Sequence, residues 1–244
     1  MPLLQKEKNL VIFGSSEMAL LAWYYFTYDT DYRVVAFTVD DSYAESFADS
    51  RHEKHGLPLV PFSKVATEYP PSLYDMHVAV GYKGFQNGKL QTLREAKYHK
   101  AKESGYRLAS YVSSRAITWP DLFIGENCFI LELNNIQPTV KIGNNVMLWS
   151  ANHIGHETII EDHVYAASHV CISGYCKIGE RTWIGVGATI RDFCNVGCDC
   201  FVTMDASIAI KKIEDGAVVI GAKSTVLLGD SPVARKLKTR YFNE

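Results

Sequence analysis

The stretch 124–201 decides the fold, because it repeats every six residues: IGENCF, ILELNN, IQPTVK, IGNNVM, LWSANH, IGHETI, IEDHVY, AASHVC, ISGYCK, IGERTW, IGVGAT, IRDFCN, VGCDCF. Position one of each hexad is aliphatic almost everywhere, with Ala166 and, near the start, Thr118 as departures. Position five is mostly small or β-branched. Weaker copies extend the repeat in both directions, so we trace it from Val112 to Ile213.

This period predicts a triangular prism. Each hexad forms one short strand and one corner, the aliphatic residue points inward, and three hexads close a coil of about 18 residues. Coils stack at roughly 4.8 Å, like neighbouring strands. No coil could bury its apolar face alone, so stacking about six of them makes the core.

Residues before the repeat predict a different fold, a small parallel α/β domain. Apolar runs typical of strands alternate with helical stretches. We expect strands at 9–13, 32–39, 75–80 and 106–112, and helices at 18–26 and 85–104. The boundary is placed near residue 110, which gives an α/β domain over 1–110 and an all-β domain over 111–244.

Ligands of parallel sheets bind at the carboxyl ends of the strands. Gly14 and Ser15 follow the first expected strand, and Asp40 follows the second. Gly14 would let backbone approach a ligand, and Asp40 could accept from a ribose hydroxyl or a base N–H. However, GSSEMA (14–19) keeps only the first glycine of GxGxxG, so a tight turn without a ligand stays open as the alternative.

Composition excludes some classes. The formal net charge of −2 argues against a nucleic-acid partner. The N-terminus has no signal-peptide core and no apolar run reaches membrane length, so we expect a cytoplasmic protein without membrane insertion. All six cysteines lie in the repeat. Four of them occupy position five and are expected to pack in the core, not to bind metal: Cys128, Cys176, Cys194 and Cys200.

Four histidines fall close together in the sequence: His153, His156, His163 and His169. His156 occupies position three, off the core positions, and is free to face outward. Gly174 follows one coil period further along the chain and should therefore lie one coil above His156. A base on one coil and an open backbone N–H on the next would bracket an acyl thioester. The alternative for Gly174 is that glycine simply suits a corner.

The segment IGHETIIEDHVYAASHVCISGYCKIG (154–179) resembles the active-site region of bacterial nucleotide-sugar acyltransferases of the hexapeptide superfamily. It is similar to the UDP-bacillosamine N-acetyltransferases and the sialic-acid O-acetyltransferases. The resemblance implies a left-handed parallel β-helix, a homotrimer, and acetyl-CoA as acyl donor. It also implies His156 as general base, Glu157 as its polarising partner, and the Gly174 N–H as donor to the thioester oxygen.

The resemblance implies ligand contacts as well. The CoA would lie against Gly174, against Ile184, Gly185 and Ala188 of IGVGAT, and against Gly221, Ala222 and Lys223. The nucleotide of the sugar would lie against Gly14, Ser15, Asp40, Gly81, Tyr82 and Lys83. Two departures stand out: GSSEMA replaces a common GxSGHG loop, and Tyr165 stands where some relatives carry a second histidine.

The leading hypothesis is transfer of an acetyl group from acetyl-CoA to the amine of a UDP- or dTDP-linked amino sugar in bacterial glycan biosynthesis, without a metal. The first alternative is O-acetylation of a sugar hydroxyl by the same residues. The second is a zinc enzyme of the γ-carbonic-anhydrase type, although the spacing of the four histidines does not match that class. The third is a nucleotide-sugar-binding module without catalysis.

Overall fold

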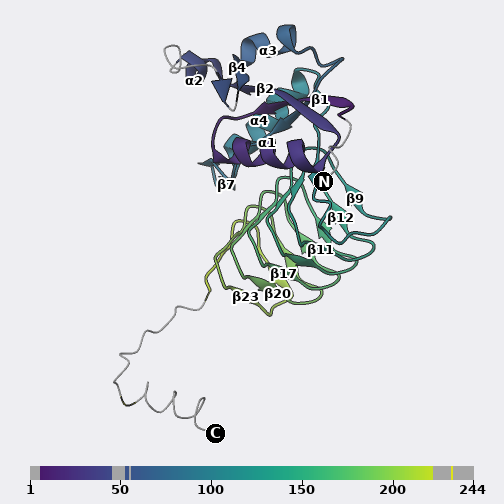
Figure 1. Cartoon of the computed structure of the whole chain (residues 1–244). Helices are drawn as coiled ribbons and strands as arrows, with labels where there is room; N and C mark the ends of the chain where they lie inside the picture. Colours follow the sequence, from purple (N-terminus) through teal and green to yellow (C-terminus); the bar gives the residue numbers. More distant parts are fainter. Residues whose placement is uncertain (1–5, 46–52, 55, 222–231, 233–244) are drawn as a thin grey trace.

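The computed structural model describes residues 6–45, 53–54, 56–221 and 232. Figure 1 shows a layered α/β part lying against a stack of triangular coils. The α/β part contains β1 (Lys8–Phe13), α1 (Glu17–Asp29), β2 (Tyr32–Val39), α2 (Asp41–Glu45), β3 (Glu53–Lys54), β4 (Leu57–Pro61), α3 (Phe62–Glu68), β5 (Asp75–Val78), β6 (Phe85–Gln86), β7 (Lys89–Leu90) and α4 (Thr92–Glu103).

Its sheet has the order β3-β4-β2-β1-β5, with β4, β2, β1 and β5 parallel. Successive strand residues point to opposite faces of the sheet. Each strand therefore contributes side chains to two apolar cores, one on each face. Leu10 and Ile12 pack under α1, whereas Val11 and Phe13 pack under α3 and α4. The parallel α/β fold expected from the sequence is confirmed.

The expected helix over 85–104 is wrong in its first part. Asn87 (φ 52°) and Gly88 (φ 78°) form the turn of a hairpin between β6 and β7. Asn-Gly is the sequence that favours such a turn, because both central residues need positive φ. The helix therefore begins only at Thr92. The expected strand over 106–112 is also divided: Leu108 bridges to Met76 of the α/β sheet, and β8 (Tyr111–Val112) already pairs within the coils.

The coils form a left-handed parallel β-helix with three flat faces, which confirms the second half of the predicted fold class. Its short strands are β8 (Tyr111–Val112), β9 (Phe123–Ile124), β10 (Phe129–Ile130), β11 (Asn135–Ile136), β12 (Lys141–Ile142), β13 (Met147–Leu148), β14 (His153–Ile154), β15 (Ile159–Ile160), β16 (Tyr165–Ala166), β17 (Cys171–Ile172), β18 (Lys177–Ile178), β19 (Trp183–Ile184), β20 (Thr189–Ile190), β21 (Asn195–Val196), β22 (Phe201–Val202), β23 (Ser207–Ile208), β24 (Lys212–Ile213) and β25 (Val218–Val219).

Each face takes every third strand. The β13 face has the order β25-β22-β19-β16-β13-β10-β8, the β14 face β11-β14-β17-β20-β23, and the β15 face β24-β21-β18-β15-β12-β9. Paired residues are one coil apart in the chain, as the register of Met147 with Tyr165 and of Tyr165 with Trp183 illustrates. The step from Ile208 to Ile213 is one residue shorter than a hexad, and β25 extends the prism beyond Ile213.

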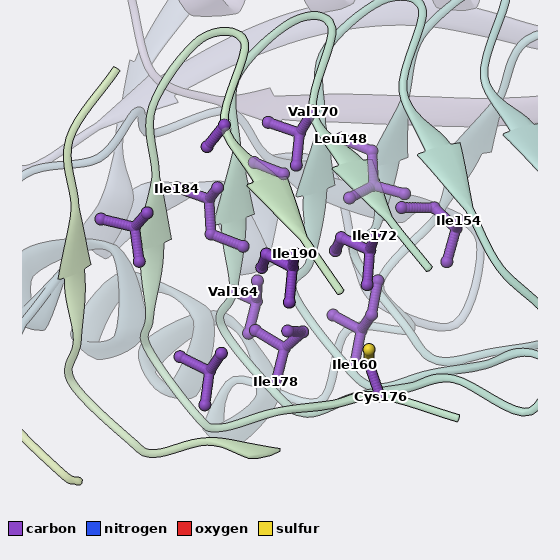
Figure 2. Close-up of a cluster of buried hydrophobic side chains, with 14 of the residues drawn as sticks. Leu148, Ile154, Ile160, Val164, Val170, Ile172, Cys176, Ile178, Ile184 and Ile190 are labelled. Carbon is purple, nitrogen blue, oxygen red and sulfur yellow. The ribbon is translucent and has the colours of Figure 1, made fainter. Parts of the chain in front are cut away.

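Figure 2 shows the interior of the prism, which is filled by positions one and five. Ile154, Ile172 and Ile190 are at most 1% exposed and stack on one another. Cys128, Cys176, Cys194 and Cys200 are buried in the same core, as the sequence predicted, and are free thiols. Burial of one isoleucine side chain contributes about 1.5–3 kcal/mol, so the prism is the main source of stability in this half.

The α/β part packs on the β13 face. The outward residues of this face, among them Tyr111, Phe129 and Met147, share one apolar core with Ala22 and Phe26 of α1. The edge between the β13 and β15 faces, which carries His163, also contacts the α/β part through α4. Among the described residues, no helix combines the length and apolar composition that a membrane span requires.

Candidate active site

His156 lies on the edge where the β14 face meets the β15 face, hereafter the His156 edge. Its backbone N–H donates to Gln137 Oε1 at 2.9 Å, which fixes the start of the corner, and its imidazole is exposed. The ring lies against Gly174 of the next coil: a Cβ built on Gly174 would be 2.9 Å from His156 Nε2 and 3.0 Å from Cε1. The coil period thus brings these two residues together, and any side chain at position 174 would displace the imidazole from this position.

Two aromatic rings continue this edge. Tyr175 meets the His156 ring edge-on, with centroids 4.9 Å apart, and Phe193 stacks on Tyr175 at 4.9 Å. Tyr175 is 51% exposed and Phe193 60% exposed. The imidazole is therefore held between glycine and an aromatic ring, on an edge whose apolar surface is open in the single chain.

The Gly174 N–H is not open, contrary to the expectation from the sequence. It donates to Asp192 Oδ1, one coil further on, at 3.1 Å. The Asp192 carboxylate satisfies an amide that has no backbone carbonyl as partner, whereas the next corner amide, Tyr175 N–H, donates to His156 O at 2.9 Å. A thioester oxygen would have to replace the Asp192 carboxylate to receive the bond.

Glu157 follows His156 at the same corner of the prism and has a left-handed backbone (φ 56°). A corner position is what a contact between these two side chains would require. Its N–H donates to Thr139 Oγ1 at 3.0 Å. In the part of the chain that the structure describes, no hydrogen bond or ion pair joins its carboxylate to the His156 imidazole. The polarising role of Glu157 stays a prediction.

The four histidines fall close together in the sequence but do not form one patch in the structure. His153 lies on the β14 face, His156 on its own edge, His163 on the edge beside α4, and His169 on the third edge. The cause is the fold itself: each hexad turns the chain to the next face, so neighbours in sequence face different directions.

The residues proposed for CoA divide into three groups. Ile184 and Ala188 are 0% exposed inside the prism, so their side chains belong to the core and a contact with CoA would have to come from their backbone. Gly185 lies tightly against the next coil, where a Cβ would be 2.5 Å from Met204 N, and the Gly221 N–H donates to Thr203 Oγ1 at 2.8 Å. Ala222 and Lys223 lie outside the described residues.

The residues proposed for the sugar nucleotide do come together, at the carboxyl edge of the α/β sheet. Gly14 has φ +130° and donates its N–H to Thr38 O at 2.8 Å. A Cβ on Gly14 would be 2.9 Å from Ala79 O, so only glycine lets the ends of β1 and β5 approach this closely. Gly81 lies beside Met18 at the start of α1. Ser15 is buried.

Asp40 is already paired. Its carboxylate binds Lys97 Nζ at 2.6 Å and Lys100 Nζ at 2.9 Å, both from α4. Burial alone would raise the pKa of Asp40, but the hydrogen bonds from the two lysines outweigh it and hold that pKa below its ordinary value. Asp40 is thus not a free acceptor, and its pairing with the two lysines was not predicted from the sequence. Two ammonium groups at the end of β2 offer a partner for phosphate.

A cluster of Glu95, His99 and His163 brings three potential metal ligands within 4.8 Å of one another, between α4 and the prism. The His163 tautomer argues against a metal. The Val78 N–H donates to Asn127 Oδ1, Asn127 Nδ2 donates to Asn145 Oδ1, and Asn145 Nδ2 therefore donates to His163 Nδ1 at 2.8 Å.

Since Nδ1 accepts, the neutral ring carries its proton on Nε2, which faces Glu95 Oε1 at 4.0 Å instead of presenting a lone pair. Burial, and next the charge of Arg94, lower the pKa of His163 to about 4. His163 is therefore a neutral imidazole at the contact between α4 and the prism. This arrangement does not favour the zinc alternative.

No protein-family model matches the sequence. Over 88 residues the chain is 26% identical to the acyl-(acyl-carrier-protein)–UDP-N-acetylglucosamine O-acyltransferase of Sinorhizobium fredii, and the match covers 33% of each protein. The chain thus spans about a third or less of the length of the curated relatives that it matches.

Solved structures match over more of the chain. The acetyltransferase domain of PglB from Neisseria gonorrhoeae FA1090 superposes with a TM-score of 0.69 at 20% identity, covering 87% of this chain and 96% of that one. PerB from Caulobacter crescentus, in complex with CoA and GDP-perosamine, gives 0.70 at 18% identity, covering 87% and 97%. The chain has the fold of these sugar acetyltransferases. The resemblance read from the sequence is confirmed at the level of the fold, in both the α/β part and the β-helix.

Proposed function

We propose that the protein transfers an acetyl group from acetyl-CoA to the amine of a nucleotide-linked amino sugar. The observation that carries this proposal is the exposed His156 imidazole, packed against Gly174 on the edge of a β-helix. The fold shared with PerB, whose structure holds CoA and GDP-perosamine, supports it. The PglB domain has likewise been captured with acetyl coenzyme A.

In the proposed reaction, the amine nitrogen attacks the thioester carbon while its proton passes to His156. Imidazole suits this role because its reference pKa of about 6.5 lies near the operating pH. The carbonyl oxygen takes the Gly174 N–H from Asp192 as negative charge develops on it. The C–S bond then breaks, and the proton on His156 passes to the CoA thiolate. The products are the amide and free CoA, and the steps need no metal.

The sugar nucleotide is proposed to bind the carboxyl edge of the α/β sheet, at Gly14, Ser15 and Gly81. Lys97 and Lys100 would share their charge between Asp40 and the diphosphate. They would compensate for the glycines that the first loop lacks. Tyr82 and Lys83 are exposed beyond Gly81 and complete this edge.

The α/β part covers the β13 face, whereas His156 lies on the edge opposite that face. A sugar held at the strand ends of one chain therefore does not reach the His156 of the same chain. This supports a homotrimer in which one chain binds the sugar and a neighbour supplies the base. Co-expression of His156→Asn with Asp40→Ala chains should restore part of the activity that each variant lacks alone, and no restoration would refute the shared site.

The function itself is tested with a panel of acyl-CoA donors and nucleotide amino sugars, with release of free thiol as readout. We expect acetyl-CoA and an amino-sugar nucleotide to be turned over, and His156→Asn to lower kcat by roughly 10²–10⁴-fold. The KM for acetyl-CoA should change little. His153→Asn and His169→Asn are matched controls. Turnover of hydroxyl but not amine acceptors would identify an O-acetyltransferase, and no turnover with any donor would refute the proposal.

A further inference from the structure

A pocket of about 430 Å³ lies between the hairpin β6–β7 and the last coils of the β13 face. Most of its walls are aromatic or aliphatic. It is lined by Tyr82, Gly84, Phe85, Leu90, Gln91, Trp183 and Phe201. None of these side chains carries a charge, so the pocket does not suit a phosphate or an ammonium group.

The floor of the pocket is the exposed end of an aromatic stripe. Outward residues of the β13 face are covered by the α/β part as far as Tyr165. Trp183 and Phe201 follow on the next two coils, with centroids 5.0 Å apart, and the cover ends there. Tyr82 closes one side, 5.6 Å from the Trp183 ring. Phe201 remains 39% exposed and Phe85, on the hairpin, 72% exposed.

The hairpin that forms the opposite wall is held in place. The Leu90 N–H donates to Asp199 Oδ1 at 2.9 Å, and Gln91 Nε2 donates to Arg181 O at 2.8 Å, so both bonds tie its base to the prism. Gly84, with φ +93°, begins the hairpin where any Cβ would clash with the backbone N of Leu93. The pocket is therefore preformed, because these hydrogen bonds within the protein hold its walls in place without a ligand.

The composition of the walls indicates the kind of ligand. Trp183, Phe201, Tyr82 and Phe85 present flat aromatic rings, and no lining side chain carries a charge. Such walls suit a nucleobase better than a sugar with many hydroxyls, because every base has a flat face that stacks on aromatic rings.

We propose that this pocket binds a nucleobase, stacked against Phe201 and Phe85. Its mouth carries Tyr82, next to Gly81 at the carboxyl edge of the sheet, so a nucleotide whose phosphates lie at that edge can extend into it. The end of β2 is not available for the base, because Asp40 is engaged by two lysines. This inference rests on the proposed function, because that function implies substrates that contain a nucleotide. Two of these substrates carry a base: the sugar nucleotide and CoA.

Binding is measured by calorimetry on the full chain, with UMP, dTMP, GMP and CoA as separate probes. Phe201→Ala and Phe85→Ala each remove one exposed ring, and Tyr24→Ala is the matched control because Tyr24 is 56% exposed on α1, outside the pocket. Each pocket variant should weaken binding of the recognised probe by roughly 5- to 100-fold, the range for the loss of one base–aromatic stack. The control should leave it unchanged.

The probes separate the two sources of the base. Weakened binding of nucleoside monophosphates alone assigns the pocket to the sugar nucleotide, and weakened binding of CoA alone assigns it to adenine. Unchanged affinity for all four probes in both variants, with unaltered melting temperatures, overturns the proposal. Binding without acetyl transfer would leave this inference standing and refute the proposed function instead, because the calorimetric readout does not depend on turnover.

Discussion

Gly174→Ala tests the contact on which the proposed chemistry depends. The new methyl group would be 2.9 Å from His156 Nε2, 3.0 Å from Cε1 and 3.3 Å from Cδ2. Carbon atoms do not approach that closely, so the imidazole must move. It can move at little cost to the fold, because it is an exposed side chain on the His156 edge and Gly174 does not have the positive φ that would strain alanine.

The expected result is a loss of rate without a loss of stability. A catalytic group displaced by about 1 Å costs roughly 10²-fold in rate, so kcat of Gly174→Ala should fall by about that factor. The melting temperature should stay within a few degrees of the wild type. The KM for acetyl-CoA should change less than kcat, since the amide N–H of residue 174 is retained.

A double-mutant cycle decides whether the loss acts through His156. In a His156→Asn background, Gly174→Ala should add little, because the displaced base is already absent. The assay is thiol release under saturating acceptor, with unfolding followed separately by circular dichroism. Full activity of Gly174→Ala, or an equal further loss in the His156→Asn background, would refute the assigned contact.

Asp40→Ala should raise the KM for the sugar nucleotide more than that for acetyl-CoA, because it removes the carboxylate that holds Lys97 and Lys100 in position at the end of β2, and an unchanged KM would remove Asp40 from the site. His163 has a pKa near 4 when folded against about 6.5 when unfolded, so below pH 6.5 the unfolded chain binds more protons and stability falls until about pH 4. Urea denaturation should show wild type losing up to about 3 kcal/mol over that window relative to His163→Asn, and parallel curves would contradict this. Ile172→Ala, inside the prism, should cost about 2–5 kcal/mol, whereas Ile159→Ala, 42% exposed on the β15 face, should cost less than about 1 kcal/mol. Elemental analysis should find no stoichiometric zinc, and one zinc per chain that disappears in His99→Ala would mean that the tautomer of His163 is wrongly assigned.

The interior of the β-helix was predictable from the sequence alone. The aliphatic residue at position one and the small residue at position five form a local pattern. This pattern recurs in every coil, so the prediction of buried positions does not depend on any single hexad. The same period placed Gly174 over His156, because residues separated by one coil period lie on neighbouring coils in any prism of this class. The Asn-Gly turn at Asn87 was also readable, although a helical pattern was preferred over it.

Other features were decided only in three dimensions. The histidines are close in sequence, yet each hexad turns the chain toward another face, so His156 and His163 lie on different edges. Asp40 is paired with two lysines of α4, which lie far from it in the sequence, and Asp192 takes the Gly174 N–H across one coil. The aromatic pocket joins Tyr82 and Phe85 to Trp183 and Phe201, which meet only because the α/β part docks on the β13 face. A six-residue period determines which side chains lie inside each coil. Contacts between the outer surface of the coils and the α/β part depend on how the two parts pack together, which no local sequence pattern predicts.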